Sequence, residues 1–390
     1  MKILYVIHDN KRGGAAISFL EMVSHIMKEH EVFVITPHKN GFLPEQLDLL
    51  GIRHINAHYY AWLIGKPESK LGLKIKKIIY YCLVKTNALE AKRIARKLKN
   101  EKFELVHTNS SVVNFGGLLS RELQLPHVWH VRELQESFDL EAVISERKLY
   151  QFIGNFSDTI IAISKYVEQN IKKKVVSRGI IQIYNGVAEK MLNQKHVFPK
   201  MGDTIKFLIA GNICKQKGQE DTVLAVRELS KQGVINFHLY IAGNGDICKL
   251  KESIDKYSLN ECITILGEVK DMKALREEMD VEIMASELEP FGRVVVEAMK
   301  SSNPVIGAAA GGTLELIDDM DTGFLYPYGD YTALAMCMKK FIDAPELVEK
   351  LGLQAYQKMK DRFTAKENAE RVMDVIGGFC DSMKKIHIKR

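Results

Sequence analysis

The sequence predicts an α/β protein made of two Rossmann-like, doubly wound domains that face a central cleft. Segments with the composition of β-strands alternate with segments whose apolar residues recur at helical spacing, which is typical of parallel βαβ units. This alternation restarts after residue 200, and each half has a glycine-containing turn after its first strand. A chain of 390 residues is long enough for two or three such domains.

The first predicted domain covers residues 1–188. It opens with a short strand over residues 2–7, a glycine turn and a helical pattern over residues 15–27. Further strands are expected at residues 31–36, 105–108, 127–130 and 159–163, because these runs are short, apolar and rich in β-branched side chains.

The second predicted domain covers residues 200–372. Its first strand, residues 205–210, ends at Gly211, and a helix is expected over residues 222–232. Another strand ends at Gly243, and later strands are expected at residues 262–266, 281–284 and 304–306. Residues 188–203 show little periodicity and contain Asn193, Pro199 and Gly202, so we interpret them as the linker between the domains.

Composition places the chain among globular proteins of a reducing compartment. Hydrophobic residues make up 46% and charged residues 27%, which argues against disordered and fibrous classes. The six cysteines are scattered without a CxxC pair, as expected of neither a disulfide framework nor a zinc site. The apolar run after Lys2 is too short for a secretory signal, and no run of about 20 apolar residues suggests a membrane span. We therefore expect a cytoplasmic protein.

The most informative stretch runs over residues 286–313. Glu289 precedes a predicted turn, and Glu297 lies in the second turn of a predicted helix over residues 293–300. Glycine-rich turns at strand ends expose backbone N–H groups that suit a phosphate or diphosphate. A carboxylate such as Glu297 can accept hydrogen bonds from two vicinal hydroxyls of a ribose. Each feature taken alone is better explained by surface carboxylates and ordinary turns.

Taken together, this stretch resembles the signature of the retaining GT-B glycosyltransferases of family GT4. That signature has two Glu with seven residues between them, here Glu289 and Glu297, within EPFGRVVVEAM, followed by NPVIG and a GGT loop. Other family-like pieces occur in the expected order across nearly the whole chain: Gly13-Gly14, Tyr184-Asn185-Gly186-Val187, Lys217-Gly218, Thr322-Gly323-Phe324-Leu325 and Arg362-Phe363-Thr364. The resemblance also implies a C-terminal helix, about residues 373–390, that packs back on the first domain.

The resemblance implies a role for each matching residue. Glu297 would bind the donor ribose, Glu289 would face the donor sugar, and Lys217 would neutralise the departing diphosphate. Backbone groups would complete the donor site, those of Phe291 and Gly292 at the sugar and those of Gly13, Gly14, Gly312 and Thr313 at the diphosphate. His130 resembles the family's acceptor-side histidine, for which we expect an orienting role; a packed strand-end histidine is the alternative.

One position departs from the family pattern. Relatives usually carry an Arg just past the glycine that ends the first strand of the second domain, and Asn212 stands there. Either Lys215 or Arg12 substitutes for this cation, or the diphosphate is held less tightly. The alternative to an enzyme is therefore a catalytically degenerate nucleotide-sugar-binding subunit or scaffold.

No metal or cofactor is expected. Asp319-Met320-Asp321 has the sequence of a metal-binding motif of another glycosyltransferase fold, but it lies in a predicted turn far in sequence from the donor loops. We expect a metal-independent, retaining transfer from a nucleoside-diphosphate sugar to a carbohydrate or lipid-linked acceptor, in cell-surface polysaccharide or glycolipid assembly. Neither glycine turn gives the GxGxxG of a dehydrogenase, and a hydrolase would need both carboxylates at one bond.

The charge of the chain is unevenly distributed. From Lys66 to Lys102 there are twelve Lys and Arg against three Glu, whereas the whole chain has a net charge of only +6. Apolar residues recur at helical spacing in this run, at Leu71, Ile75, Ile78 and Ile79, and a second helix is expected over residues 90–99. We predict docking on an anionic membrane surface and no nucleic-acid partner. The alternative is that the apolar stripe packs on the domain core and the lysines only solubilise the protein.

Overall fold

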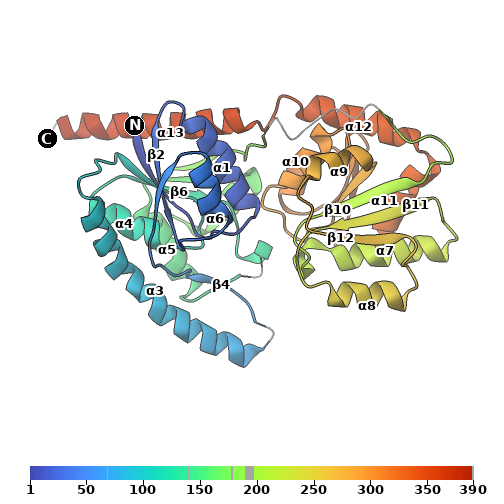
Figure 1. The fold of residues 1–390 in the computed structure, drawn as a ribbon, viewed down its shortest axis with the longest axis horizontal. Helices are drawn as coiled ribbons and strands as arrows, with labels where there is room; N and C mark the ends of the chain where they lie inside the picture. The colour runs from blue at the N-terminus through green and yellow to red at the C-terminus, as the bar shows by residue number, and fades with distance from the viewer. Residues whose placement is uncertain (68, 139, 177–178, 189–196, 389–390) are drawn as a thin grey trace. The chain divides into compact units, whose positions relative to one another are not determined.

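The computed structural model describes residues 1–67, 69–138, 140–176, 179–188 and 197–388 (Figure 1). The chain forms two compact units. The first combines Met1–Gly186 with Thr364–Arg390, and the second is Val187–Phe363. Residues 189–196, in the middle of the predicted linker, lie outside the described part of the chain.

The first unit is built on a parallel sheet in the order β3-β2-β1-β5-β6-β8-β9. A small antiparallel pair, β4 and β7, lies apart from this sheet. The strands are β1 (Lys2–Val6), β2 (Glu31–Thr36), β3 (Arg53–Asn56), β4 (Leu63–Gly65), β5 (Leu105–Thr108), β6 (His127–Val131), β7 (Leu140–Ala142), β8 (Thr159–Ala162) and β9 (Ile180–Gln182).

Alternation along β1 sends side chains to both faces of this sheet. Ile3 and Tyr5 belong to a core that includes buried residues of the first and last helices, whereas Leu4 and Val6 pack with residues of α3 and α4. The helices are α1 (Gly14–Ile26), α2 (Phe42–Leu49), α3 (Lys70–Leu98), α4 (Phe115–Leu123), η1 (Glu136–Phe138), α5 (Glu146–Phe156), α6 (Lys165–Lys174) and α13 (Ala365–Ile388).

The C-terminal helix α13 belongs to the first unit. Val372 and Ile376 are fully buried in the core that also holds α1, and Figure 1 shows α13 beside α1 and β2. Asn368 Nδ2 donates to Tyr184 O at 2.6 Å, near the other end of the unit's main segment. The second unit therefore ends at Phe363 and not at residue 372, because α13 begins at Ala365 and already packs on the first unit from there.

The basic run forms one continuous helix. We expected two helices, but α3 spans all 29 residues of Lys70–Leu98. Between residues 73 and 98 the sequence has neither Gly nor Pro, so nothing interrupts the intrahelical hydrogen bonds there. No helix within the described residues is long and apolar enough to cross a bilayer.

The second unit has a six-stranded parallel sheet in the order β12-β11-β10-β13-β14-β15. This is the order of a doubly wound sheet: the first three strands are added toward one edge, and the next three are added on the other side of β10. The strands are β10 (Ile205–Ala210), β11 (Phe237–Ala242), β12 (Ile263–Gly267), β13 (Val281–Met284), β14 (Val305–Ala308) and β15 (Gly323–Tyr326).

Helices of the second unit cover this sheet and bury a core that includes Phe207, Leu239 and Ile283. The helices are η3 (Lys215–Lys217), α7 (Gln219–Lys231), α8 (Cys248–Lys256), α9 (Met272–Glu278), α10 (Arg293–Lys300), η4 (Gly311–Glu315), α11 (Tyr331–Asp343) and α12 (Glu346–Met359). Both sheets confirm the prediction of two Rossmann-like α/β folds.

Candidate functional site

Three loops gather the predicted residues of the second unit. Strands β10, β13 and β14 are neighbours in the sheet. The loop after β10 carries Lys217, the loop after β13 carries Glu289, and the loop after β14 carries Thr313. Strands β10 and β13 flank the point at which strand order reverses, where open α/β sheets bind ligands beyond the carboxyl ends of their strands.

Lys217 and Glu289 form an ion pair. Lys217 Nζ donates a hydrogen bond to Glu289 Oε2 at 2.5 Å, and the two side chains are 23% and 13% exposed. Gly218 follows with a φ of +72°, and a Cβ there would lie 2.2 Å from Ala285 O. Because residue 218 is glycine, the loop that carries Lys217 can approach the end of β13. This approach allows contact between Lys217 and Glu289, which are 72 positions apart in the sequence.

The loops after β13 and β14 pack tightly on one another. Gly312 N donates to Glu289 O at 2.6 Å, and a Cβ on Gly311, whose φ is +58°, would lie 2.6 Å from the same oxygen. A Cβ on Gly312 would lie 2.9 Å from Pro290 O. The two glycines therefore fix the backbone of Glu289. Thr313 is buried beside them, and its Oγ1 has no hydrogen-bond partner among the described residues.

Phe291 and Gly292 make the turn into α10. The ring of Phe291 is buried and meets Phe363 edge to face at a centroid distance of 5.6 Å. Gly292 precedes the helix with a φ of +96°, a conformation that favours glycine. The roles expected of these two residues concern their backbone groups, and they stay predictions.

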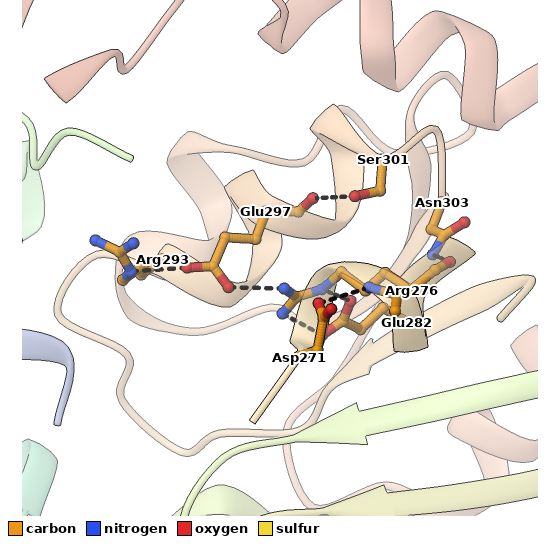
Figure 2. A network of polar contacts seen from close by, with 8 residues as sticks. Asp271, Arg276, Glu282, Arg293, Glu297, Ser301 and Asn303 are labelled. Carbon is orange, nitrogen blue, oxygen red and sulfur yellow. Dashed lines mark hydrogen bonds and ion pairs between the residues drawn. The ribbon is translucent and has the colours of Figure 1, made fainter. Parts of the chain in front are cut away.

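Glu297 lies in a buried network of charges (Figure 2). Its Oε2 lies 2.8 Å from Arg276 Nη1, and its Oε1 accepts from Arg293 Nε at 2.7 Å. Arg276 also donates from Nε and Nη2 to the two oxygens of Glu282, at 2.8 and 3.1 Å. Two carboxylates and two guanidinium groups thus alternate in a row that runs from β13 to α10.

This network keeps Glu297 ionised. Burial raises the pKa of Glu297, but the guanidinium groups of Arg276 and Arg293 outweigh burial and hold the pKa below its ordinary value. Each carboxylate oxygen has two lone pairs, and each of the two hydrogen bonds uses one. The Glu297 carboxylate can therefore still accept hydrogen bonds from a ligand.

Sequence reasoning missed Arg276, Glu282 and Arg293. The available signal was Glu282, which interrupts the apolar strand VEIM and is fully buried in the structure. Lys, Glu, Arg and Asp are almost never fully buried unless paired, so such a residue predicts a partner. The sequence did not reveal that the partner is Arg276 on the preceding helix α9.

Asn212 is exposed on the loop after β10, where its backbone oxygen accepts from Gln219 Nε2 at 3.1 Å. Lys215 is exposed on the same loop. Arg12 belongs to the first unit, where its guanidinium lies 5.9 Å from the centre of the Phe42 ring. Which of these side chains meets a phosphate stays a prediction.

Gly13 and Gly14 follow β1 in the first unit, and helix α1 begins at Gly14. A Cβ on either glycine would meet no heavy atom within 4 Å. These glycines are therefore not required for packing within the described residues, and the space beside their backbone is open to a ligand.

His130 lies inside the first unit, and the orienting role expected of it stays a prediction. It lies on β6, is fully buried, and its Nδ1 is 3.3 Å from Nε2 of His107 on β5. Its Nε2 has no hydrogen-bond partner among the described residues. Burial holds the pKa values of both histidines well below the ordinary value, so both are neutral near pH 7. His107 is a partner that sequence reasoning did not find.

A second polar network adjoins these histidines. Arg132 Nη1 donates to Asn185 Oδ1 at 2.5 Å, and Arg132 Nε donates to Asn109 Oδ1 at 2.8 Å. Glu133 Oε1 accepts from the hydroxyls of Ser110 and Ser111, both at 2.8 Å. Arg132 therefore ties the Tyr184-Asn185-Gly186 segment to the carboxyl ends of β5 and β6.

The two acidic side chains of Asp319-Met320-Asp321 make hydrogen bonds that stabilise the turn before β15. Asp319 Oδ1 accepts from Leu325 N at 2.9 Å, and Asp321 Oδ1 accepts from Gln354 Nε2 at 2.9 Å. Across the ranges that the structure describes, no group of three or more His, Cys, Asp or Glu side chains is arranged to hold a metal ion.

Comparison with known proteins agrees with this fold and these motifs. Residues 12–190 match the family model Glycosyltransferase Family 4, and residues 191–358 match Glycosyl transferases group 1. An uncharacterized glycosyltransferase of Methanocaldococcus jannaschii is 27% identical over 260 residues, which cover 65% of this chain and 70% of the relative. A lipopolysaccharide core biosynthesis mannosyltransferase of Rhizobium leguminosarum bv. viciae is 29% identical over 178 residues, 44% of this chain and 49% of the relative.

Among solved structures, the Anabaena protein HepE in complex with UDP and glucose shares the fold. Its TM-score is 0.79 at 19% identity, and the match covers 97% of this chain and 100% of HepE. Two doubly wound units and two family models that together span residues 12–358 define a GT-B glycosyltransferase. The chain belongs to the glycosyltransferases of group 1, family 4.

Proposed function

We propose that the chain transfers a sugar from a nucleoside-diphosphate sugar with retention of anomeric configuration and without a metal ion. The observation that carries this proposal is the ion pair of Lys217 with Glu289 beyond the ends of β10 and β13, followed in the same unit by Glu297 on helix α10. HepE, which shares the fold, is known in complex with UDP and with UDP-glucose.

Each group suits one part of such a donor. A cation at Lys217 would stabilise the negative charge that develops on the departing diphosphate. The backbone N–H of Thr313 would bind the same phosphates, whereas the N–H of Gly312 already donates to Glu289 O and holds this loop in place. Glu297, kept ionised by two arginines, would accept hydrogen bonds from the ribose hydroxyls, and Glu289 would face the sugar.

Retention would follow from same-face attack, in which the leaving phosphate takes the proton of the acceptor hydroxyl. His130 is buried and neutral, and a histidine with a strongly lowered pKa is a weak base at pH 7. Its place beside His107 supports an orienting role in the acceptor half and not the role of a general base.

The functional experiment is a panel of nucleotide sugars screened by thermal shift, followed by turnover with and without EDTA. A ligand that binds only the folded chain raises its apparent stability. We expect one donor to stabilise the chain and to be turned over in EDTA. Loss of turnover in EDTA that a divalent ion restores would refute metal independence, and binding without any turnover would favour the scaffold alternative.

We further propose that the acceptor is at a membrane surface, in polysaccharide or glycolipid assembly. The relative from Rhizobium acts in lipopolysaccharide core biosynthesis. In this chain the support comes from α3. All buried residues of α3 lie from Val84 onward, and its first half contributes none to the core.

The first half of α3 presents apolar side chains to solvent. Leu71, Ile75 and Ile78 are 69%, 51% and 66% exposed. At 100° per residue these side chains fall on one stripe with Cys82 and Leu89, opposite the face that Val84 and Ala91 bury. This arrangement argues against the alternative in which the apolar stripe packs on the domain core, and it is typical of a helix that lies in a membrane interface.

Lysines flank this stripe. Lys74 and Lys85 are exposed along one side of it, so they suit anionic headgroups. Lys76 and Lys77 are poorer candidates, because Lys76 Nζ donates to Gly65 O and Lys77 Nζ pairs with Glu141.

Liposome co-sedimentation tests the membrane proposal. We expect binding that requires anionic lipid and weakens with salt. The double variant Lys74→Glu/Lys85→Glu should weaken binding by about thirtyfold or more, since each basic residue near the leaflet is worth about 1 kcal/mol. The control Lys249→Glu/Lys251→Glu changes two exposed lysines of α8 and should bind like the wild type. Equal binding to neutral and anionic vesicles, or none, would remove the membrane proposal alone.

A further inference from the structure

We propose that Arg276 is a positioning residue of the donor site, which orients the Glu297 carboxylate for the ribose hydroxyls without touching the ligand itself. This inference rests on the proposed role of Glu297. Its basis is the geometry of three buried side chains from α9, β13 and α10 (Figure 2).

Arg276 is held more rigidly than an ordinary surface arginine. Its Nε and Nη2 make a fork to both oxygens of Glu282, and this bidentate geometry fixes the plane of the guanidinium. Asn303 Nδ2 also donates to the backbone oxygen of Arg276 at 2.9 Å. The third nitrogen, Nη1, is thereby aimed at Glu297 Oε2 at 2.8 Å.

Burial separates the roles of the two arginines at Glu297. The Arg276 side chain is 2% exposed and Glu282 is 1% exposed, whereas Arg293 and Glu297 are 12% and 11% exposed. A ligand can therefore reach Glu297 and Arg293 but not Arg276. Arg276 lies behind the carboxylate and acts through it.

Glu282 makes this arrangement possible. Without Glu282, the buried Arg276 would add an unbalanced positive charge beside Glu297. Glu282 supplies a second carboxylate, so the row of two carboxylates and two guanidinium groups has no net charge. Removing Arg276 would leave two buried carboxylates close together. Burial and the neighbouring carboxylate would then both favour a protonated Glu297.

The test compares two ligands in two proteins by calorimetric titration. The probes are UDP and 2′,3′-dideoxy-UDP, or the matching pair for the base that the wild type prefers. If Glu297 binds the ribose hydroxyls, the wild type should prefer UDP by about tenfold or more. The test variant is Arg276→Met/Glu282→Leu, because replacing a buried ion pair by apolar residues of similar volume is often tolerated. In this variant we expect the preference to fall to about one.

A merely structural defect would weaken both ligands equally and keep their ratio. Leu334→Ala, a cavity variant in the core of the same unit, is the control for lost stability and should keep the wild-type ratio. Arg276→Lys keeps the positive charge but loses the bidentate contact with Glu282, and it should give an intermediate ratio of the two affinities. This variant replaces the double variant in the test if the double variant does not fold. A wild-type ratio in both Arg276 variants would overturn this inference alone. A wild type that binds UDP and its dideoxy analogue equally would overturn the role of Glu297 as well, and a wild type that binds no nucleoside diphosphate would overturn the proposed function.

Discussion

Lys217 Nζ lies 2.5 Å from Glu289 Oε2, although the family resemblance implies that the two residues face different parts of one donor. A diphosphate at Lys217 would compete with Glu289 for the same ammonium group. Both side chains are partly exposed, so the pair can separate at moderate cost in free energy. This relationship leads to the first prediction.

Glu289→Gln should bind a nucleoside diphosphate more tightly, because Lys217 no longer has a carboxylate partner. We expect a gain of about 1 kcal/mol, or about fivefold, together with a lower turnover of the nucleotide sugar. Calorimetry with UDP measures the first effect and a donor turnover assay the second. Glu220→Gln removes an exposed carboxylate nearby on α7 and should leave both unchanged. Weaker UDP binding in Glu289→Gln would contradict the competition.

Glu297→Gln should weaken donor binding and also lower stability. Each hydrogen bond lost from a charged acceptor is worth roughly 1.5–3 kcal/mol. The same substitution removes a charge partner from buried Arg276, so the midpoint of urea unfolding should fall. Donor affinity equal to that of the wild type in a folded variant would show that Glu297 does not contact the donor.

Asn212→Arg should tighten binding of a nucleoside diphosphate if residue 212 faces the phosphates. The residue is exposed, so the larger side chain can be accommodated. We expect a gain of about 1 kcal/mol from one added cation, reduced by added salt. Asn212→Gln lengthens the side chain without adding charge and is the matched control. Unchanged binding in both variants would mean that the loop does not face the phosphates or that another cation already fills the position.

The first unit should lose stability in mild acid. Burial lowers the pKa of His107, His127 and His130, in the case of His127 to about 4, whereas an unfolded histidine titrates near 6.5. Between these values the unfolded chain binds more protons, so the stabilisation is complete above about pH 6.5 and is lost as the pH falls below it. Each histidine contributes a slope of at most about 1.4 kcal/mol per pH unit.

Tryptophan fluorescence can follow this effect, because both tryptophans, Trp62 and Trp129, belong to the first unit. The free energy of unfolding measured in urea should fall steadily from pH 7 to pH 5. A constant value over that range would show that the three histidines are not held neutral by burial.

The repeated strand and helix pattern was sufficient to predict five strands of each main sheet, because parallel strands buried on both faces are short apolar runs that end at glycines such as Gly211 and Gly243. It did not mark β15 or the strands β3 and β9, and these two contain no fully buried residue. The end of the second unit was misplaced because Ala365–Ile388 is amphipathic throughout, and nothing local says which core buries Val372. The basic run was predicted as two helices but forms one. Its middle contains the polar Asn87, which is buried because its Nδ2 donates to Tyr60 O and Asn114 Oδ1, and these partners are distant in sequence.

Motif spacing found the residues of the candidate site but not their supports. Glu289 and Glu297 were recognisable from their spacing, whereas Arg276 and His107 are brought close by tertiary packing alone. The local sequence does not indicate which distant residues will pair. The structure is therefore needed to identify side chains that contact a site residue but do not contact the ligand.

The central claim is that the second unit binds a nucleoside-diphosphate sugar through Lys217, Glu289 and Glu297 without a metal ion. Its most direct test is a calorimetric titration of the wild type and of Glu297→Gln with a panel of nucleotide sugars in excess EDTA. The account predicts that one donor binds the wild type under these conditions and binds the variant about tenfold or more weakly. Absence of binding until a divalent ion is added, or equal affinity in both proteins, would contradict it.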